Sequence, residues 1–505
     1  MLKRYFFCLS MLSLLLVGCV QKEEITVSKP VEKEKVEETD ENKETDTQAR
    51  EEKLTFKKAT QRPVDLSRKD ESIASFKPEG FVTENKAKYD LSIKLAEDGK
   101  FTASSTIKID NLSEDTWDDI IFYFIPNSFT EKWKPEHLSN PSTADITHVS
   151  IDGEKVEYQL VNDTLQLLVN KPLAPNGKAV VSIDYKFTLP ENGFRFSFSE
   201  NNYYLAQWYP MLATYRSGWD KEPYLPTGES YNTGFSDFTV NYEVPEGFTI
   251  ISSDEKEAKK QGPKGTLTLK NSKEFFLAIT TNMKMQAKKV AGVEVRVFAH
   301  SIDEKRIASA LDVSVDSLRY FNKYIGKYPY KQLDVIMAEG GMEYPGIVTV
   351  TGGEIHEHTI VHEIAHQWFY GLVSNHSYHH TWVDEGLTDF ATHLYFMDQK
   401  KLSEKEVFEF GKEMIVRDRI NNNLKKAHLP LHEYTNGGFS VANYKVPSVE
   451  LWKLSGDFET ARSYLKTYVN FYSYKEVDAH EWFRYTQTFF KIEDPSVLTE
   501  WIHVE

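Results

Sequence analysis

Two histidines and two glutamates at defined spacings carry the strongest chemical signal in this 505-residue chain. They lie in the run His362-Glu363-Ile364-Ala365-His366 and, after eighteen further residues, at Glu385. Residues four apart share one face of a helix, so His362 and His366 can bind one metal ion together. Two imidazoles and one carboxylate are a zinc ligand set that leaves the fourth tetrahedral position open to water. With Glu363 beside that water, the pattern predicts a hydrolase that uses one zinc ion.

The residues around this motif favour a buried helix over a chance match on a surface. An apolar stripe flanks the motif and consists of Ile360, Val361, Ile364, Ala365 and Trp368. Imidazoles and carboxylates buried in such surroundings are costly unless a partner satisfies them, and a metal ion is such a partner. The alternative is a degenerate site that has lost its function.

Composition limits what else the chain can be. Apolar residues make up 40% of it, which is typical of a globular protein, and its length suggests two or three domains. The formal net charge of −16 argues against a nucleic-acid partner, because such proteins present clustered basic surfaces.

The first residues have the pattern of an export signal. Lys3 and Arg4 precede a short apolar run that ends in Leu16-Val17-Gly18-Cys19, a sequence typical of a bacterial lipobox. We expect residues 1–18 to be a lipoprotein signal peptide, Cys19 to carry the lipid, and the protein to be anchored outside the cytoplasm on the cell membrane. A plain signal peptide or a marginal helix is the alternative. Since Cys8 and Cys19 are the chain's two cysteines, no disulfide is expected after processing.

Patterning divides the remaining chain into three parts. Residues 19–72 are rich in Glu, Lys, Thr and Asp and poor in aromatic residues, which predicts a disordered tether. Residues 73–292 alternate apolar and polar side chains between turn signals such as Asp98-Gly99, which predicts an all-β domain. Residues 293–505 predict a mainly helical α+β domain that contains the metal motif.

Within the last part, the positions of several elements follow from periodicity. Apolar residues recur at helical spacing from Ile307 to Ile325, and short apolar runs at 333–337 and 347–351 predict strands. The motif should lie on a helix over about 357–370, and a further helix should begin near Asp384, with Glu385 in its first turn.

Taken together, these motifs resemble the zinc aminopeptidases of the aminopeptidase N and leukotriene hydrolase type, a gluzincin family. The resemblance rests on the spaced zinc motif, on Trp382-Val383-Asp384-Glu385-Gly386, and on the glycine-rich segment that ends at Glu343. It implies a β-saddle or sandwich N-domain followed by a thermolysin-like catalytic domain. It also implies peptides as substrates.

The family's roles can be carried over to individual residues. His362, His366 and Glu385 would bind zinc, and Glu363 would be the general base. Tyr444 is the candidate donor to the oxygen that becomes negatively charged during the reaction, with a structural packing role as its alternative.

The resemblance also implies substrate-binding residues. Glu343 would pair with the substrate's free α-ammonium, and the backbone of Gly340 and Gly341 would pair with extended substrate. A simple turn position is the alternative for Glu343. Gln207 is a second candidate contact to the amine. Tyr344 stands where the family has Asn, which changes the surroundings of the first subsite.

Other polar residues near the motif have weaker claims. Asp389 could orient a metal ligand or be a solvated helix residue. Loop or surface positions are expected for a group of histidines without ligand spacing: His356, His358, His376, His379, His380 and His393.

The resulting hypothesis is a membrane-anchored zinc aminopeptidase without the large C-terminal helical domain of many relatives, and therefore with a more open cleft. An endopeptidase with the same site and a catalytically silent peptide-binding lipoprotein are the alternatives. The sequence does not indicate an oligomeric state.

Overall fold

The computed structural model describes residues 54–225, 228–254, 262–300, 304–338, 340–352, 356–434 and 438–504. The expected signal peptide, Cys19 and the first part of the expected tether lie outside these residues. No helix in the described ranges is long and apolar enough to cross a membrane.

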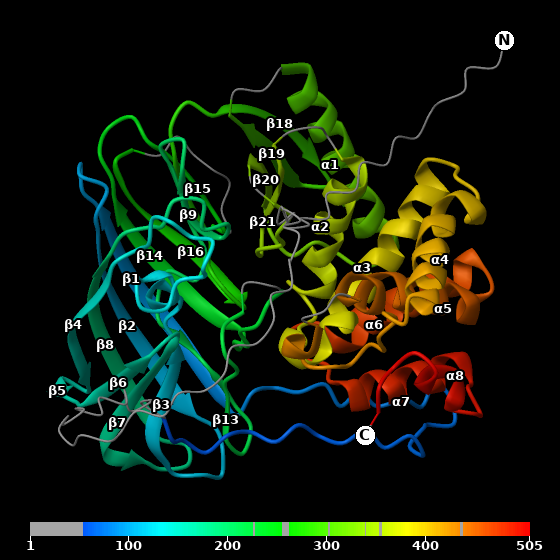
Figure 1. The fold of residues 1–505 in the computed structure, drawn as a ribbon, viewed down its shortest axis with the longest axis horizontal. Coiled ribbons are helices and arrows are strands. Elements are labelled where there is room, and N and C mark those ends of the chain that lie inside the picture. The colour runs from blue at the N-terminus through cyan, green and yellow to red at the C-terminus, as the bar shows by residue number, and fades with distance from the viewer. Residues whose placement is uncertain are drawn as a thin grey trace, which may run out of the picture. The chain divides into compact units, whose positions relative to one another are not determined.

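Strands build the first half of the described chain, as the alternating pattern predicts (Figure 1). In β1 (Asn85–Leu95), every second residue is buried and the others are exposed. A turn at Gly99, whose φ of +80° is accessible to glycine, leads into the antiparallel strand β2 (Phe101–Asn111). The buried faces of such strands form the core of this half.

Seven strands form the largest sheet, in the order β16-β14-β1-β2-β8-β4-β5. Smaller sheets have the orders β15-β17-β10-β9, β11-β3-β7-β6 and β12-β13. The bounds of the other strands in this half are β3 Trp117–Tyr123, β4 Ala144–Ile151, β5 Glu154–Lys155, β6 Tyr158–Val161, β7 Thr164–Leu173, β8 Lys178–Phe187, β9 Phe196–Ser199, β10 Asn202–Leu205, β11 Met211–Leu212, β12 Thr214–Tyr215, β13 Trp219–Asp220, β14 Ser236–Glu243, β15 Thr249–Ser252, β16 Lys264–Ser272 and β17 Leu277–Thr280.

The second half combines one sheet with the helices (Figure 1). The sheet has the order β18-β19-β20-β21, with bounds Lys284–Val290, Val293–Ala299, Gln332–Ala338 and Ile347–Thr351. The helices are α1 Glu304–Tyr324, α2 Glu357–Phe369, α3 Ser377–Gln399, α4 Glu404–Ile420, α5 Val446–Ser455, α6 Phe458–Tyr472, α7 Ala479–Phe490 and α8 Ser496–Thr499. Three short helices are η1 Ile125–Phe129, η2 Leu431–Tyr434 and η3 Val441–Lys445. The predicted fold class, a β-rich part followed by a mainly helical part, is confirmed.

Two boundaries differ from the predictions. The predicted division at residue 292 separates β18 from β19, yet these strands pair along their full length, so β18 belongs to the second sheet. Helix α3 begins at Ser377, earlier than the predicted start near Asp384, and His380 has non-helical backbone angles within it. Glu385 therefore lies beyond the helix's first turn.

Residues 54–72, predicted as the end of a disordered tether, are held against the folded body. The Arg62 guanidinium donates two hydrogen bonds to Asp478, at 2.9 and 2.7 Å. The Asp65 backbone N–H donates to His480 Nδ1 at 3.1 Å. The prediction is wrong for these residues because hydrogen bonds and ion pairs fix a segment that is poor in apolar side chains. The hydrophobic pattern of the sequence gives no information about such pairs.

Candidate active site

The three predicted metal ligands converge on one point. His362 Nε2, His366 Nε2 and Glu385 Oε2 lie 3.1 Å from one another in every pair. The histidines face the same side of α2, and Glu385 comes from α3, which packs against it. All three residues are buried. The sequence spacing therefore produces the arrangement expected of a metal centre.

This arrangement fits a zinc ion. Bonds of about 2.0–2.2 Å at a tetrahedral ion place its ligand atoms roughly 3.3–3.6 Å apart, close to the spacing seen here. Burial opposes ionisation of Glu385, but His366 and His362 outweigh it and hold the pKa of Glu385 well below its usual range. Thr388 Oγ1 lies 3.1 Å from His366 Nδ1 and fixes the orientation of that ring. The set thus offers one anionic and two imidazole ligands.

Glu363 lies beside this set and touches the glycine-rich segment. A Cβ added to Gly341 would lie 2.4 Å from Glu363 Oε1, so only glycine lets the backbone approach this carboxylate so closely. Burial raises the pKa of Glu363 to about 8. A dication bound at the neighbouring ligands would lower this pKa toward neutrality, where a carboxylate can accept and return a proton.

Further carboxylates gather at the same place. Oxygen atoms of Glu229, Glu343 and Glu385 lie within 4.8 Å of one another. Arg195 pairs with Glu229 at 2.7 Å, whereas no described residue donates a hydrogen bond to the buried Oε1 of Glu343. Burial and the neighbouring Glu229 raise the pKa of Glu343 well above its usual range. The site therefore has one unsatisfied acceptor among crowded carboxyl groups, and a cationic ligand would favour their ionised form.

Glu229 and Arg195 are two residues of the site that were not predicted from the sequence. Glu229 lies in the loop between β13 and β14, and Arg195 lies just before β9. Neither position belongs to a periodic pattern or a spaced motif, and only tertiary folding brings the β-rich half to the metal ligands.

Gln367 connects the metal helix to the segment that carries Glu343. It is buried next to His366, donates from Nε2 to the Tyr344 carbonyl at 3.0 Å, and accepts from the Gly346 N–H at 2.8 Å. These two bonds fix the turn that follows Glu343. Tyr344, the departure from the family pattern, stacks on Phe276 with ring centroids 4.3 Å apart.

Gly340 and Gly341 lie at the edge of the second sheet, as the β-pairing hypothesis requires. The next residue, Met342, forms an antiparallel bridge with Thr349 of β21, and Thr349 Oγ1 donates to the Gly340 carbonyl. Gly340 has a φ of +75°, and a Cβ there would lie 1.9 Å from the Phe194 ring.

Gln207 is buried but its hydrogen bonds do not reach the metal ligands. Its Nε2 donates to Tyr231 and to Glu274, each at 3.0 Å. Glu274 also accepts from Tyr370, which follows α2. Within the described chain, Gln207 Oε1 has no hydrogen-bond partner. Its proposed contact with the substrate amine stays a prediction.

Tyr444 lies at the metal ligands. Its hydroxyl donates to Glu385 Oε1 at 2.6 Å, and its ring stacks on His362 with centroids 5.8 Å apart. Burial and Glu385 raise the pKa of Tyr444 well above its usual value, so the hydroxyl stays protonated and can donate.

The tyrosine belongs to the π-helix η3, a geometry frequent at functional sites. A Cβ on Gly386 would lie 2.5 Å from Pro447 Cβ, so Gly386 lets the segment with Tyr444 approach α3 closely. Pro447, three residues after Tyr444, thus packs against the glycine that directly follows Glu385.

The surface positions predicted for the neighbouring histidines are wrong in part. His376, His380 and His393 are buried. His376 Nε2 lies 2.9 Å from Asp220 Oδ1, and His393 Nδ1 lies 2.6 Å from Ser448 Oγ. Tertiary polar partners satisfy these rings, and the local sequence does not reveal such partners.

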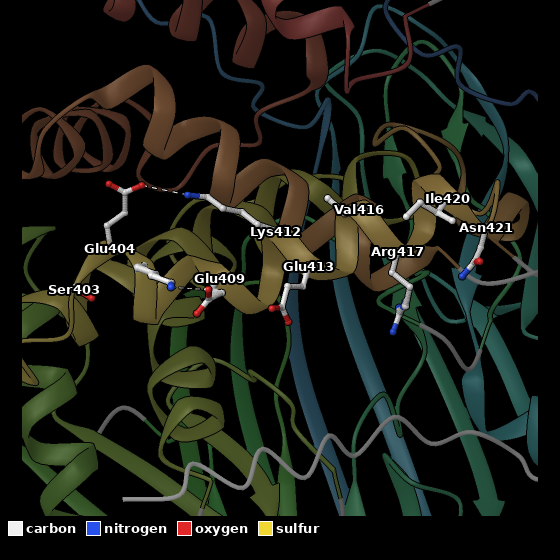
Figure 2. Close-up of a pocket in the computed structure, with 10 residues that line it drawn as sticks. Ser403, Glu404, Glu409, Lys412, Glu413, Val416, Arg417, Ile420 and Asn421 are labelled. Atoms are coloured by element: carbon white, nitrogen blue, oxygen red, sulfur yellow. Dashed lines mark hydrogen bonds and ion pairs between the residues drawn. The ribbon is translucent and has the colours of Figure 1, made fainter. Parts of the chain in front are cut away.

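A surface hollow along α4 lies apart from these residues. Figure 2 shows its lining, in which Lys412 pairs with Glu404 and Lys405 with Glu409. Two exposed apolar side chains, Val416 and Ile420, also line it. None of the predicted site residues lines this hollow, so we assign it no chemistry.

Comparison with known families agrees with this geometry. Residues 309–484 match the Peptidase family M1 domain. Over 286 residues the chain is 25% identical to aminopeptidase M1-B of Oryza sativa, covering 50% of this chain and 32% of the relative. It is 27% identical to leukotriene A-4 hydrolase of Xenopus laevis over 199 residues (34% of this chain, 32% of the relative) and 26% identical to aminopeptidase N of Acetobacter pasteurianus over 197 (34% and 52%). The chain thus spans about a third to a half of the length of these relatives.

Solved structures share the fold. An M1 zinc metallopeptidase from Deinococcus radiodurans superposes with a TM-score of 0.62 at 15% identity, over 84% of this chain and 94% of that one. A mutant of that metallopeptidase gives a TM-score of 0.62 at 14% identity, over 87% and 97%. The predicted resemblance to the aminopeptidase N and leukotriene hydrolase type is confirmed.

Proposed function

We propose that this chain, whose residues 309–484 form a peptidase family M1 domain, is a zinc metallopeptidase that removes N-terminal residues from peptides. The observation that carries the proposal is the convergence of His362, His366 and Glu385 at 3.1 Å beside Glu363. A structural zinc site would close its fourth position with another protein ligand and has no use for a base.

The chain's own residues divide the chemistry between them. Zinc, when bound, supplies a Lewis acid that makes water more acidic and polarises a carbonyl. Glu363 takes a proton from the attacking water and returns it to the leaving amine. Tyr444 donates its hydroxyl hydrogen bond to the oxygen that becomes negatively charged. Each of these two groups lies next to a metal ligand.

The acceptors around Glu343 support cleavage at a free N-terminus. An α-ammonium is a cation with three N–H donors, which matches the unpartnered Glu343 Oε1 and the neighbouring Glu229 carboxylate. A peptide bound through its ammonium presents its first peptide bond to the metal site. An internal segment of a chain has no such cation and would leave Glu343 Oε1 unsatisfied.

A substitution at Glu363 tests the peptidase assignment. Glu363→Gln keeps the side chain's size but cannot accept the proton, so turnover should fall by at least about 10²-fold while one zinc ion stays bound. Glu413→Gln, at an exposed position on α4, is the matched control and should leave turnover and zinc content unchanged. Substantial turnover by the Glu363 variant would contradict the assignment.

We also infer that Cys19 anchors the protein to the outer face of the cell membrane. The support is the lipobox pattern that precedes it. When cell extracts are partitioned in Triton X-114, the wild-type protein should enter the detergent phase. The Cys19→Ser protein should enter the aqueous phase or appear in the medium. Equal partitioning of both would contradict lipid attachment.

A further inference from the structure

The two helices that hold the predicted zinc ligands carry a second group of ligand-type side chains. His358 of α2, with Asp389 and His393 of α3, offers atoms that all lie within 4.8 Å of one another. The predicted zinc set takes two residues four apart on α2 and one on α3. The second group reverses this, because Asp389 and His393 are four apart on α3 and His358 comes from α2. A search for two histidines four residues apart does not find this group, because the residue four positions before His393 is the aspartate Asp389.

Distances within this group are slightly longer than a bound ion would require. His358 Nε2 lies 3.7 Å from Asp389 Oδ1, and His393 Nε2 lies 3.9 Å from Asp389 Oδ2. A tetrahedral zinc ion would place its ligand atoms roughly 3.3–3.6 Å apart. The His358 side chain is 47% exposed, so it can rotate to close the gap and leaves a path for an ion from solvent.

The second group also has the supporting contact that metal-binding histidines usually have. His393 Nδ1 lies 2.6 Å from the Ser448 hydroxyl, which leaves Nε2 facing Asp389. His393 and Asp389 are both buried. One ring is therefore held in place by its second nitrogen, while the exposed ring is adjustable.

A lysine now neutralises the carboxylate. Lys445 Nζ lies 3.1 Å from both oxygens of Asp389. A divalent ion on Asp389 would have to displace this ammonium, because the two cations would repel each other strongly at such a distance. Lys445 directly follows Tyr444 in η3, so its displacement would disturb the segment that carries the predicted oxyanion donor.

We propose that His358, Asp389 and His393 form a second site for a divalent transition-metal ion of the zinc class, at which the ion competes with Lys445 for Asp389. Imidazole and carboxylate are ligands that zinc accepts. The first site has three ligands and no competing cation, so it fills first. The second site fills at higher zinc concentration. The ion bound there lowers turnover because it displaces Lys445 and so disturbs η3, which carries Tyr444. Binding at the second site stands apart from the peptidase assignment, and only its effect on turnover rests on the proposed function.

Metal stoichiometry tests the proposal without any activity assay. The full chain is dialysed against buffers with a graded series of free zinc concentrations. Zinc bound per chain is then measured by elemental mass spectrometry. The wild type should bind one equivalent first and a second at free zinc on the order of 100-fold higher. His358→Asn should bind one equivalent throughout, and the exposed His148→Asn control should bind two.

Two further variants test the competition and guard against misfolding. Lys445→Gln removes the competing charge and should lower the zinc concentration needed for the second equivalent by about tenfold or more. His393→Gln should lose the second equivalent, and its thermal unfolding midpoint shows whether it folds. A wild type that binds one equivalent at every zinc concentration would overturn the proposal, as would a second equivalent that survives in a folded His358→Asn protein.

Discussion

Replacing Glu343 with glutamine should remove selectivity for a free N-terminus without unfolding the protein. Glutamine has nearly the same size as glutamate but no charge. The buried Glu343 Oε1 has no donor among the described residues, so the change breaks no hydrogen bond to that atom. Neighbouring carboxylates already disfavour a negative charge here, since burial and Glu229 raise the pKa of Glu343. Stability should therefore stay the same or increase.

The size of the effect follows from the contact that would be lost. A hydrogen bond to a charged group contributes about 1.5–3 kcal/mol. Each 1.4 kcal/mol corresponds to a factor of ten, so kcat/KM for a free-amine peptide should fall about 10- to 150-fold.

The assay compares kcat/KM for two enzymes on each of two substrates. Wild type and Glu343→Gln are each measured on a tripeptide and on its des-amino analogue, in which hydrogen replaces the ammonium. The wild type should prefer the free amine by about the same 10- to 150-fold, and the variant should treat both alike. The exposed Glu413→Gln protein is the control and should behave as wild type. Equal losses on both substrates would refute a role for Glu343 in reading the amine.

Three further substitutions test the role of Tyr444, the packing at Gly386 and the Asp220–His376 pair. Tyr444→Phe should lower kcat by about 10²–10³-fold with KM and zinc content unchanged, as steady-state kinetics and metal analysis would show. Gly386→Ala places a Cβ 2.5 Å from a proline side chain, so it should lower the free energy of unfolding in urea by about 1–3 kcal/mol and reduce kcat. Gly411→Ala, whose Cβ meets nothing closer than 3.6 Å, should do neither. Burial opposes both charges of the Asp220–His376 pair, but each partner outweighs it, which lowers the pKa of Asp220 and raises that of His376. The aspartate's contribution is lost as pH falls through its lowered pKa, and the histidine's as pH rises through its raised pKa. Asp220→Asn should therefore destabilise most, by about 3–5 kcal/mol, between about pH 4 and 6.5, as urea unfolding at several pH values would show.

The parts of the site that were predictable from the sequence are those fixed by helix geometry. His362 and His366 must share a face of α2 because they are four residues apart, and the structure places both at Glu385. The strands of the first half were likewise predictable, since their buried side chains alternate.

What the sequence did not reveal depends on contacts between distant segments. Glu229 and Arg195 reach the metal ligands only because the β-rich half folds against the helices. Arg62 fixes a polar segment by pairing with Asp478, which lies 416 residues later. His376 can be buried because its Nε2 is hydrogen-bonded to Asp220 Oδ1. Local pattern carries no information about such pairs.

We propose that the chain cuts peptides from a free N-terminus by zinc-dependent hydrolysis. The most direct measurement incubates the purified protein, beginning after Cys19, with one peptide in free-amine and N-acetylated forms, with and without a chelator, and follows the products by mass spectrometry. We expect stepwise loss of N-terminal residues from the free-amine form alone, abolished by the chelator and restored by zinc. Internal cuts in both forms, or no cleavage of either, would contradict it.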